Sequence, residues 1–373
     1  MTPDARPPRV AYVTSSQGVG GGAEHLLAAL VAGGGDRGWD QLVLNPFGTD
    51  ASRALADLCP AGHYRGRRCD RWNQLPGLRR WLQRELDRFQ PDVVHVVLLQ
   101  ALFVVATLRK RPGARWLLTH VYGDVFGVRR FGPIDQHVDR WAGRRFDHVV
   151  AISDAVREFL VTDHRYPAAK VTRIQPGWEG EPLPRTDEGP PTVISVGKLR
   201  PEKGHDVLLL AFDLVRRQVP AARLVIVGDG DLRPSLEAKA RALGLTDAVT
   251  FAGAVTSIWP YLARAWVFAS ASLSEAFGIA VVEAMAAGLP VVAPAVGAIP
   301  ELVTPGVTGE LYPSRNHEAL AHHLVKLLGS PELRHSMGEA GRQTAAGFHM
   351  ARTVDRYFDL YDELLGRAVR AHP

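Results

Sequence analysis

Short apolar runs rich in β-branched residues recur along the whole chain, separated by stretches with helical spacing. In the first half the runs lie at 9–15, 41–45, 92–97, 115–119 and 147–152. In the second half they lie at 192–197, 222–228, 248–252, 265–270 and 289–293. Alternation of strands and helices at this spacing is typical of βαβ units and parallel sheets. The pattern therefore predicts an α/β protein with two doubly wound, Rossmann-like domains.

The segment PGWEGEPLPRTDEGPP, residues 176–191, separates the two series and is dense in Pro, Gly and charge, which is typical of a linker. We expect an N-terminal domain over 1–178 and a C-terminal domain over 192–350. Residues 351–366 place apolar side chains at helical spacing, which predicts an amphipathic helix. We expect this C-terminal segment, 351–373, to pack back on the N-terminal domain.

Two such domains facing each other form a cleft, and sheets of this type bind ligands at the carboxyl ends of their strands. The motifs that carry chemistry should therefore follow strands directly.

Composition and charge narrow the class of protein. With 46% hydrophobic and 22% charged residues and no apolar run long enough to span a bilayer, the chain reads as globular. The start, MTPDARPPRV, lacks the apolar stretch of a signal peptide, so a cytoplasmic location is expected. Cys59 and Cys69 match neither a redox nor a zinc spacing, so that reduced thiols are expected.

The formal charge of +5 is uneven, because residues 1–180 hold 25 Lys and Arg against 18 Asp and Glu. This excess of positive charge has two interpretations. It is either a merely solvated surface, or a surface that favours an acidic acceptor or an anionic membrane. The membrane interpretation allows peripheral contact with the inner face of the membrane. Nucleic acid is not expected as a partner, because the Arg residues are scattered and not interleaved with aromatic residues.

The first motif, GVGGGAE at 18–24, lies between the opening strand and a helix. Glycines allow a close approach to phosphate, and the helix start offers N–H groups to an anion. The same turn also opens NAD-binding folds or serves architecture alone. No acidic residue ends the second strand as an NAD ribose requires, which disfavours a dehydrogenase.

The second motif, TVISVGKLRPEKGHDVLLLAF at 192–212, has the same order of strand, loop and helix. Lys198 and Lys203 flank this loop together with Arg200, and only six of the chain's 44 basic residues are Lys. These charges suit a diphosphate leaving group, and a solvated loop is the alternative.

The third motif, SLSEAFGIAVVEAMAAGLPVVA at 272–293, separates Glu275 from Glu283 by seven residues, with Gly278 where a helix should begin. Two carboxylates that flank a helix N-terminus could bind hydroxyls of a sugar and a ribose on either side of a diphosphate. Helix-start and surface charges are the alternative interpretation.

Together these motifs resemble family 4 of the glycosyltransferases, retaining enzymes with the GT-B fold. The resemblance covers the whole chain and also includes VIVGDGDLR at 225–233 and GAIPELV at 297–303, in the family's order and spacing. It implies a nucleotide-sugar donor, a small-molecule, glycan or lipid-linked acceptor, and no metal or other cofactor.

The resemblance implies roles for matching positions. The implied donor-binding residues are Gly21, Gly22, Lys198, Lys203, Gly228, Asp229, Val255, Glu275, Phe277, Gly278, Ile279 and Glu283. By this resemblance, the two lysines are expected to contact the diphosphate. Glu275 is expected to contact the transferred sugar, and Glu283 is expected to contact the ribose. Lys198 stands where the family usually has Arg, and Lys cannot make the bidentate phosphate contact of Arg.

His120 follows a first-domain strand where the family places a His beside the reacting sugar, so that His120, Lys203 and Glu275 are the expected catalytic residues. A satisfied loop histidine is the alternative. The expected acceptor side holds Tyr122, Asp124, Arg129 and Arg130. Trp178, where relatives carry an Asn-Gly turn, either caps the cleft or packs the linker.

The family is thought to react by front-face attack, in which the leaving phosphate takes the acceptor's proton. Electrostatic stabilisation of that phosphate is then the main catalytic effect. A UDP-sugar is the expected donor. Alternatives are a GT-B-type nucleotide-sugar epimerase or phosphorylase, and a non-catalytic subunit that only binds sugar nucleotides.

Overall fold

The computed structural model describes residues 6–15, 22–47, 64–67, 74–121, 140–186 and 188–368. The chain divides into two compact units. The first comprises the described residues up to Gly177 and those from Met350 onward, and the second comprises Trp178–His349. Each unit is an α/β domain on its own parallel sheet, which confirms the predicted fold class.

The first sheet, as far as the structure describes it, has seven parallel strands in the order β3-β2-β1-β4-β5-β6-β7. Its strands are β1 (Arg9–Thr14), β2 (Asp40–Asn45), β3 (Tyr64–Gly66), β4 (Val93–Val97), β5 (Arg115–His120), β6 (His148–Ala151) and β7 (Val171–Arg173). Its helices are α1 (Gly22–Asp36), α3 (Leu75–Phe89), α4 (Leu99–Ala106), α6 (Asp154–Thr162) and α14 (Met350–Leu364).

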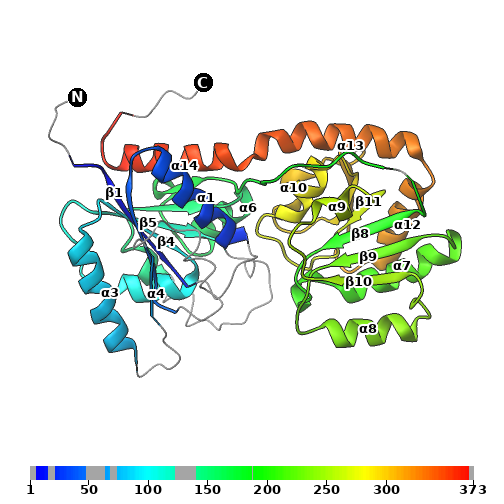
Figure 1. The fold of residues 1–373 in the computed structure, drawn as a ribbon, viewed down its shortest axis with the longest axis horizontal. Helices are drawn as coiled ribbons and strands as arrows, with labels where there is room; N and C mark the ends of the chain where they lie inside the picture. Colours follow the sequence, from blue (N-terminus) through cyan, green and yellow to red (C-terminus); the bar gives the residue numbers. More distant parts are fainter. Residues whose placement is uncertain are drawn as a thin grey trace. The chain divides into compact units, whose positions relative to one another are not determined.

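The C-terminal helix α14 belongs to this first unit and lies beside α1 (Figure 1). Val354, Phe358 and Tyr361, which the sequence places on one face, are buried in a core shared with α1 and the sheet. Burial of this apolar stripe stabilises the helix, because a helix of this length is marginal in water by itself.

Polar groups also join α14 to the sheet. His95 on β4 lies 2.7 Å from the hydroxyl of Tyr361 and 2.7 Å from that of Thr119 on β5. The Thr119 hydroxyl lies 2.9 Å from the hydroxyl of Tyr357. Burial lowers the pKa of His95 to about 3, so that the ring is neutral at neutral pH. Because each of these groups has a partner, their burial costs little.

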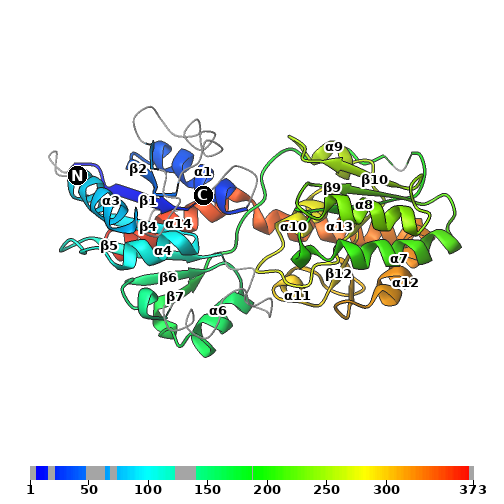
Figure 2. The same cartoon turned by 90° about the horizontal axis from the view of Figure 1, so that it is seen from below.

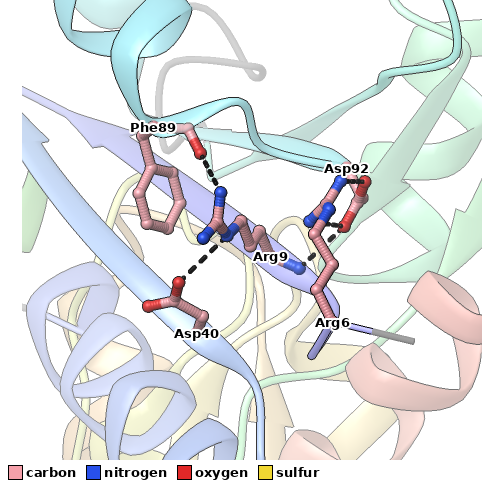
Figure 3. A network of polar contacts seen from close by, with 5 residues as sticks. All are labelled: Arg6, Arg9, Asp40, Phe89 and Asp92. Atoms are coloured by element: carbon pink, nitrogen blue, oxygen red, sulfur yellow. Dashed lines mark hydrogen bonds and ion pairs between the residues drawn. The ribbon is translucent and has the colours of Figure 1, made fainter. Parts of the chain in front are cut away.

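At the amino ends of its strands, the first sheet is stabilised by hydrogen bonds and ion pairs between charged side chains (Figure 3). Arg6 makes two hydrogen bonds to Asp92, at 3.0 and 2.6 Å, and Asp92 also accepts from the Arg9 backbone N–H at 2.9 Å. The Arg9 side chain donates to Asp40 at 3.0 Å and to the Phe89 carbonyl at 3.1 Å. Part of the basic excess of the first half therefore holds the ends of β1, β2 and β4 together.

The second sheet, within the described residues, has six parallel strands in the order β10-β9-β8-β11-β12-β13. Its strands are β8 (Thr192–Val196), β9 (Arg223–Val227), β10 (Val249–Gly253), β11 (Val267–Ala269), β12 (Val291–Pro294) and β13 (Gly309–Tyr312). Its helices are α7 (His205–Gln218), α8 (Arg233–Ala242), α9 (Trp259–Leu262), α10 (Ile279–Ala286), α11 (Ile299–Leu302), α12 (His317–Leu328) and α13 (Pro331–Ala345).

Helices cover both faces of this second sheet, with α7, α8 and α12 on one face and α10 and α13 on the other (Figures 1 and 2). A hydrophobic core lies under α7 and α12, where Leu208, Phe212 and Leu324 are fully buried. This doubly wound arrangement leaves the carboxyl ends of the strands free of crossing helices.

None of the helices in the described part of the chain is long and apolar enough to cross a bilayer.

Candidate functional site

A topological switch lies between β8 and β11 in the second sheet. From β8 the chain adds β9 and β10 on one side, whereas β11, β12 and β13 follow on the other. β8 and β11 pair directly through Val193↔Val267 and Ile194↔Phe268. Loops that leave two such strands in opposite directions form the place where open α/β sheets bind ligands.

The loops after β8 and β11 touch backbone to backbone. A 3-10 turn, Pro201–Lys203, ends at Gly204, whose φ is 59°. A Cβ at Gly204 would lie 2.1 Å from the carbonyl oxygen of Ala271, so only glycine fits without moving the loops apart. The N–H of Leu273 donates to the carbonyl of Glu202 at 2.8 Å. These contacts fix the loops that carry the second and third motifs.

Lys203 and Glu275 form an ion pair across these two loops. Their side chains are 28% and 15% exposed, so the pair lies at the surface of the sheet edge and is partly shielded from water. Charges in such a setting interact more strongly than fully solvated ones. The structure thus brings together two residues, one from each motif, that the sequence predicts to be catalytic.

The N-terminus of α10 lies directly after Glu275 and Phe277. Gly278 precedes the helix with a φ of 102°, and no side chain among the described residues caps this end. The N–H of Ala298 donates to the Glu275 carbonyl at 3.1 Å, which holds the loop in place. Uncapped N–H groups and the positive end of the helix dipole favour an anion at this position.

Glu283 lies on α10, one turn beyond the start of the helix. It is half-buried, and burial raises the pKa of its carboxyl to about 7. A carboxylate kept from water without a cation is costly unless a ligand supplies hydrogen bonds. This environment makes Glu283 a candidate for binding hydroxyl groups of a ligand.

The remaining predicted donor residues follow neighbouring strands of the same sheet. Gly228 directly follows β9 with a φ of 131°, and a Cβ there would lie 2.0 Å from the carbonyl oxygen of Gly197. Asp229 is exposed and forms an ion pair of 3.1 Å with Arg233. Lys198 is exposed on the loop after β8, and Val255 is half-buried after β10. All four therefore lie at the carboxyl edge.

Two further residues near this site were not singled out by the sequence. Ser272 is buried and donates a hydrogen bond of 2.9 Å to Glu275, three residues further along. His205, next to Gly204, is also buried, and burial together with Lys203 lowers its pKa to about 4. Neutral His205 adds no positive charge beside Lys203. The Ser-x-x-Glu spacing was the available signal for Ser272.

The residues predicted in the first unit are mostly not described. Gly21, Tyr122, Asp124, Arg129 and Arg130 lie outside the described residues. Gly22 is exposed at the first residue of α1.

His120 is the last residue of β5 and is buried. Its ring lies edge-on to that of His164, with centroids 6.3 Å apart. It therefore lies at the carboxyl edge of the first sheet, where the sequence places it.

Trp178 packs the linker within the second unit. Its indole N–H donates to the Ala345 carbonyl at 2.7 Å, and its backbone N–H donates to the Phe348 carbonyl at 2.8 Å. Its ring lies 5.6 Å from that of Trp259, centroid to centroid. Of the two roles considered for Trp178, these contacts favour packing.

Metal ligation was also considered. Within residues 6–15, 22–47, 64–67, 74–121, 140–186 and 188–368, no group of three or more His, Cys, Asp or Glu residues is placed to hold an ion.

Known protein families match both halves of the chain. Residues 20–179 match the family described as Glycosyltransferase Family 4, and residues 182–344 match Glycosyl transferases group 1. A GDP-mannose-dependent alpha-(1-6)-phosphatidylinositol monomannoside mannosyltransferase of Mycobacterium tuberculosis is 31% identical over 263 residues, which are 65% of this chain and 68% of the relative.

Solved structures resemble the chain over nearly its full length. Sucrose-phosphate synthase from Thermosynechococcus elongatus has a TM-score of 0.82 at 22% identity, covering 96% of this chain and 99% of that one. Anabaena HepE in complex with UDP and glucose has a TM-score of 0.81 at 20% identity, covering 95% and 100%. At these identities the likeness concerns the fold.

Proposed function

The chain belongs to family 4 of the glycosyltransferases and has their GT-B fold, and from this premise we propose that it is a retaining, metal-independent hexosyltransferase. It moves a sugar from a nucleotide diphosphate donor to an acceptor hydroxyl. The observation that carries the proposal is the Lys203–Glu275 pair at the switch between β8 and β11, beside the uncapped start of α10.

The second unit supplies groups that suit each part of a nucleotide sugar. Lys203 and the amides at Phe277, Gly278 and Ile279 favour the negative diphosphate. Glu275 accepts hydrogen bonds from sugar hydroxyls, and Glu283 accepts them from the ribose. The base binds past Gly228, near Asp229 and Val255.

The proposed reaction is front-face attack at the anomeric carbon. The bond from that carbon to the leaving diphosphate breaks, and the acceptor oxygen bonds to the same face while its proton passes to the leaving phosphate. Negative charge grows on the diphosphate, so that Lys203 and the helix N-terminus stabilise the transition state more than the bound donor. His120 from the first unit is proposed as a further catalytic residue.

The donor is proposed to be a UDP-hexose, with a GDP-hexose as the second candidate. The fold relative HepE was solved with UDP and glucose, whereas the 31% identical relative is GDP-mannose-dependent. That relative acts on a phosphatidylinositol monomannoside, which makes a lipid-linked acceptor one of the classes to examine beside glycans and small molecules.

Thermal unfolding with UDP, GDP, their hexose derivatives and the corresponding nucleosides tests the donor site. A ligand that binds only the native state raises its stability, so UDP and a UDP-hexose should raise Tm, and uridine, which lacks the diphosphate, should not. Turnover is then followed with and without acceptors, and NMR assigns the anomeric configuration of the product. Consumption of the donor without any acceptor would indicate an epimerase. Donor binding without turnover on any acceptor would indicate a binding subunit.

Activity should persist in excess chelator. Lysine and a helix dipole can neutralise the diphosphate in place of a divalent ion, and the assay compares initial rates with EDTA alone and with added Mg²⁺ or Mn²⁺. Equal rates are expected. A strict requirement for Mn²⁺ would contradict the metal-independent part of the proposal.

A further inference from the structure

A line of buried groups leads from the second sheet to Glu275. Tyr312 on β13 donates a hydrogen bond of 2.8 Å to the carbonyl of Ser270. The Ser270 hydroxyl donates to that of Ser272 at 3.3 Å, and Ser272 donates to Oε1 of Glu275 at 2.9 Å. Ser270 and Ser272 are only 7% and 3% exposed. The line therefore begins at β13 and at the residue that follows β11.

The chemistry of the partners fixes the direction of these bonds. An ionised carboxylate only accepts, so Ser272 must donate its proton to Glu275. The oxygen of Ser272 then has lone pairs to accept the proton of Ser270. Chains of this kind polarise their members and strengthen the final bond. Ser272 is thereby oriented before any ligand binds.

The two oxygens of Glu275 have different surroundings. Oε1 accepts from both Ser272 and Lys203. Oε2 has no hydrogen bond to another of the described residues. With Oε1 held, Oε2 is the oxygen that can accept from hydroxyls of the donor sugar.

Ser272 and Lys203 hold Oε1 in different ways. Lys203 is a flexible side chain, 28% exposed, and its ammonium is needed at the diphosphate during the reaction. Ser272 is short and buried, and one rotatable bond places its hydroxyl 2.9 Å from Glu275. The serine can keep the carboxylate oriented while the lysine shares its hydrogen bonds with the leaving group.

We propose that Ser272 is a positioning residue that fixes the orientation of Glu275 and so determines how tightly the sugar part of the donor is bound. This inference rests on the function proposed for Glu275. Ser272 itself touches neither sugar nor diphosphate and acts only through the carboxylate.

The test compares binding of a nucleoside diphosphate with binding of its sugar derivative. The probes are UDP with UDP-glucose and GDP with GDP-mannose, and isothermal titration measures Kd for the pair that the donor panel selects. Ser272→Ala should leave Kd for the nucleoside diphosphate within about twofold of the wild-type value. It should raise Kd for the sugar nucleotide about tenfold, which is the order expected for a lost hydrogen bond to a charged group. A variant that binds the nucleoside diphosphate normally is folded.

A double-mutant cycle separates positioning from general damage. Glu275→Ala should selectively weaken binding of the sugar nucleotide, and so raise the ratio of its Kd to the Kd of the nucleoside diphosphate. Adding Ser272→Ala to Glu275→Ala should change this ratio no further. Ser153→Ala is the matched control, because Ser153 is buried and its hydroxyl accepts a hydrogen bond of 3.1 Å from the Val156 N–H at the start of α6. The Ser153→Ala variant should be less stable than the wild type, with an unchanged ratio of the two Kd values.

Each outcome decides one proposal. If Glu275→Ala leaves the ratio unchanged, the role proposed for Glu275 fails, and the inference on Ser272 fails with it. If Glu275→Ala changes the ratio and Ser272→Ala does not, only the inference on Ser272 is wrong. Equal weakening of both ligands by Ser272→Ala, or an additional effect in the Glu275→Ala background, would likewise overturn it.

Discussion

Replacing Lys203 by alanine should lower kcat about 100-fold or more, the usual order for loss of one pre-organised group that stabilises developing charge. Lys203 is tied to Glu275, and the loop contacts at Gly204 hold its turn against the loop after β11. The ammonium is therefore already in place before charge develops on the diphosphate. Initial rates at saturating donor and acceptor measure the effect, and KM for the donor should rise less than kcat falls.

Lys326→Ala provides the control for this substitution. Lys326 also forms an ion pair with a glutamate, at 2.7 Å from Glu310, and belongs to the same unit. Its loss removes a positive charge and an ion pair away from the carboxyl-edge loops, so kcat should stay near the wild-type value. Turnover of Lys203→Ala within about fivefold of wild type would refute the electrostatic role, for which two orders of magnitude are expected.

The sequence predicts most of the strands because buried parallel strands read as short apolar runs. Runs such as 92–97 and 192–197 correspond closely to β4, Val93–Val97, and β8, Thr192–Val196. Residues facing helices on both sides must be apolar at every position, which makes the signal strong. The amphipathic helix expected over 351–366 is α14, Met350–Leu364, for the same reason.

The strands that were missed are short and lie at sheet edges. β3 and β7 have three residues each, and β13, GELY, begins with a glycine. A Cβ at Gly309 would lie 2.1 Å from the carbonyl oxygen of Val291, so the residue that weakens the pattern is the one that lets β13 approach β12. Such close approach depends on tertiary contacts that one sequence does not reveal.

The site could be predicted as a set of motifs but not as a set of contacts. Lys203 and Glu275 are 72 residues apart, and only the pairing of β8 with β11 brings them together. The spacing of Glu275 and Glu283 could be read from the sequence, whereas the partial burial of Glu283 depends on the packing of α10 against α13 and β12. Ser272 was missed because a Ser-x-x-Glu spacing is common and gains meaning only with the burial of the serine, and His205 carries no signal until its burial is known.

Replacing Glu283 by glutamine should make the protein more stable and its donor binding weaker. Burial raises the pKa of Glu283 to about 7, above the 4.5 of a free glutamate. Above pH 7 the folded state therefore holds a poorly solvated carboxylate that the unfolded state solvates fully. This penalty shrinks as pH falls through about 7 and is gone below the unfolded pKa, because the carboxyl is then neutral in both states.

The neutral amide removes that penalty, so Glu283→Gln should raise the free energy of unfolding by roughly 2 to 4 kcal/mol at pH 8.5 and by much less near pH 5. Urea unfolding at both pH values measures the change, and Glu339→Gln, with an exposed carboxylate on α13, should be nearly neutral at both.

The same substitution should weaken donor binding about tenfold at pH 8.5, since an amide accepts ribose hydrogen bonds less strongly than a carboxylate does. In the wild type, Kd for the sugar nucleotide, whose diphosphate has no oxygen that titrates near neutral pH, should rise as pH falls below about 7. In Glu283→Gln this dependence should disappear.

Stability gained without any loss of affinity would show that Glu283 is merely a buried charge. Affinity lost without any gain in stability would show that its carboxyl is not held from water. A residue that destabilises the fold and strengthens binding is expected where burial deprives a carboxylate of water and a bound ligand supplies the missing hydrogen bonds.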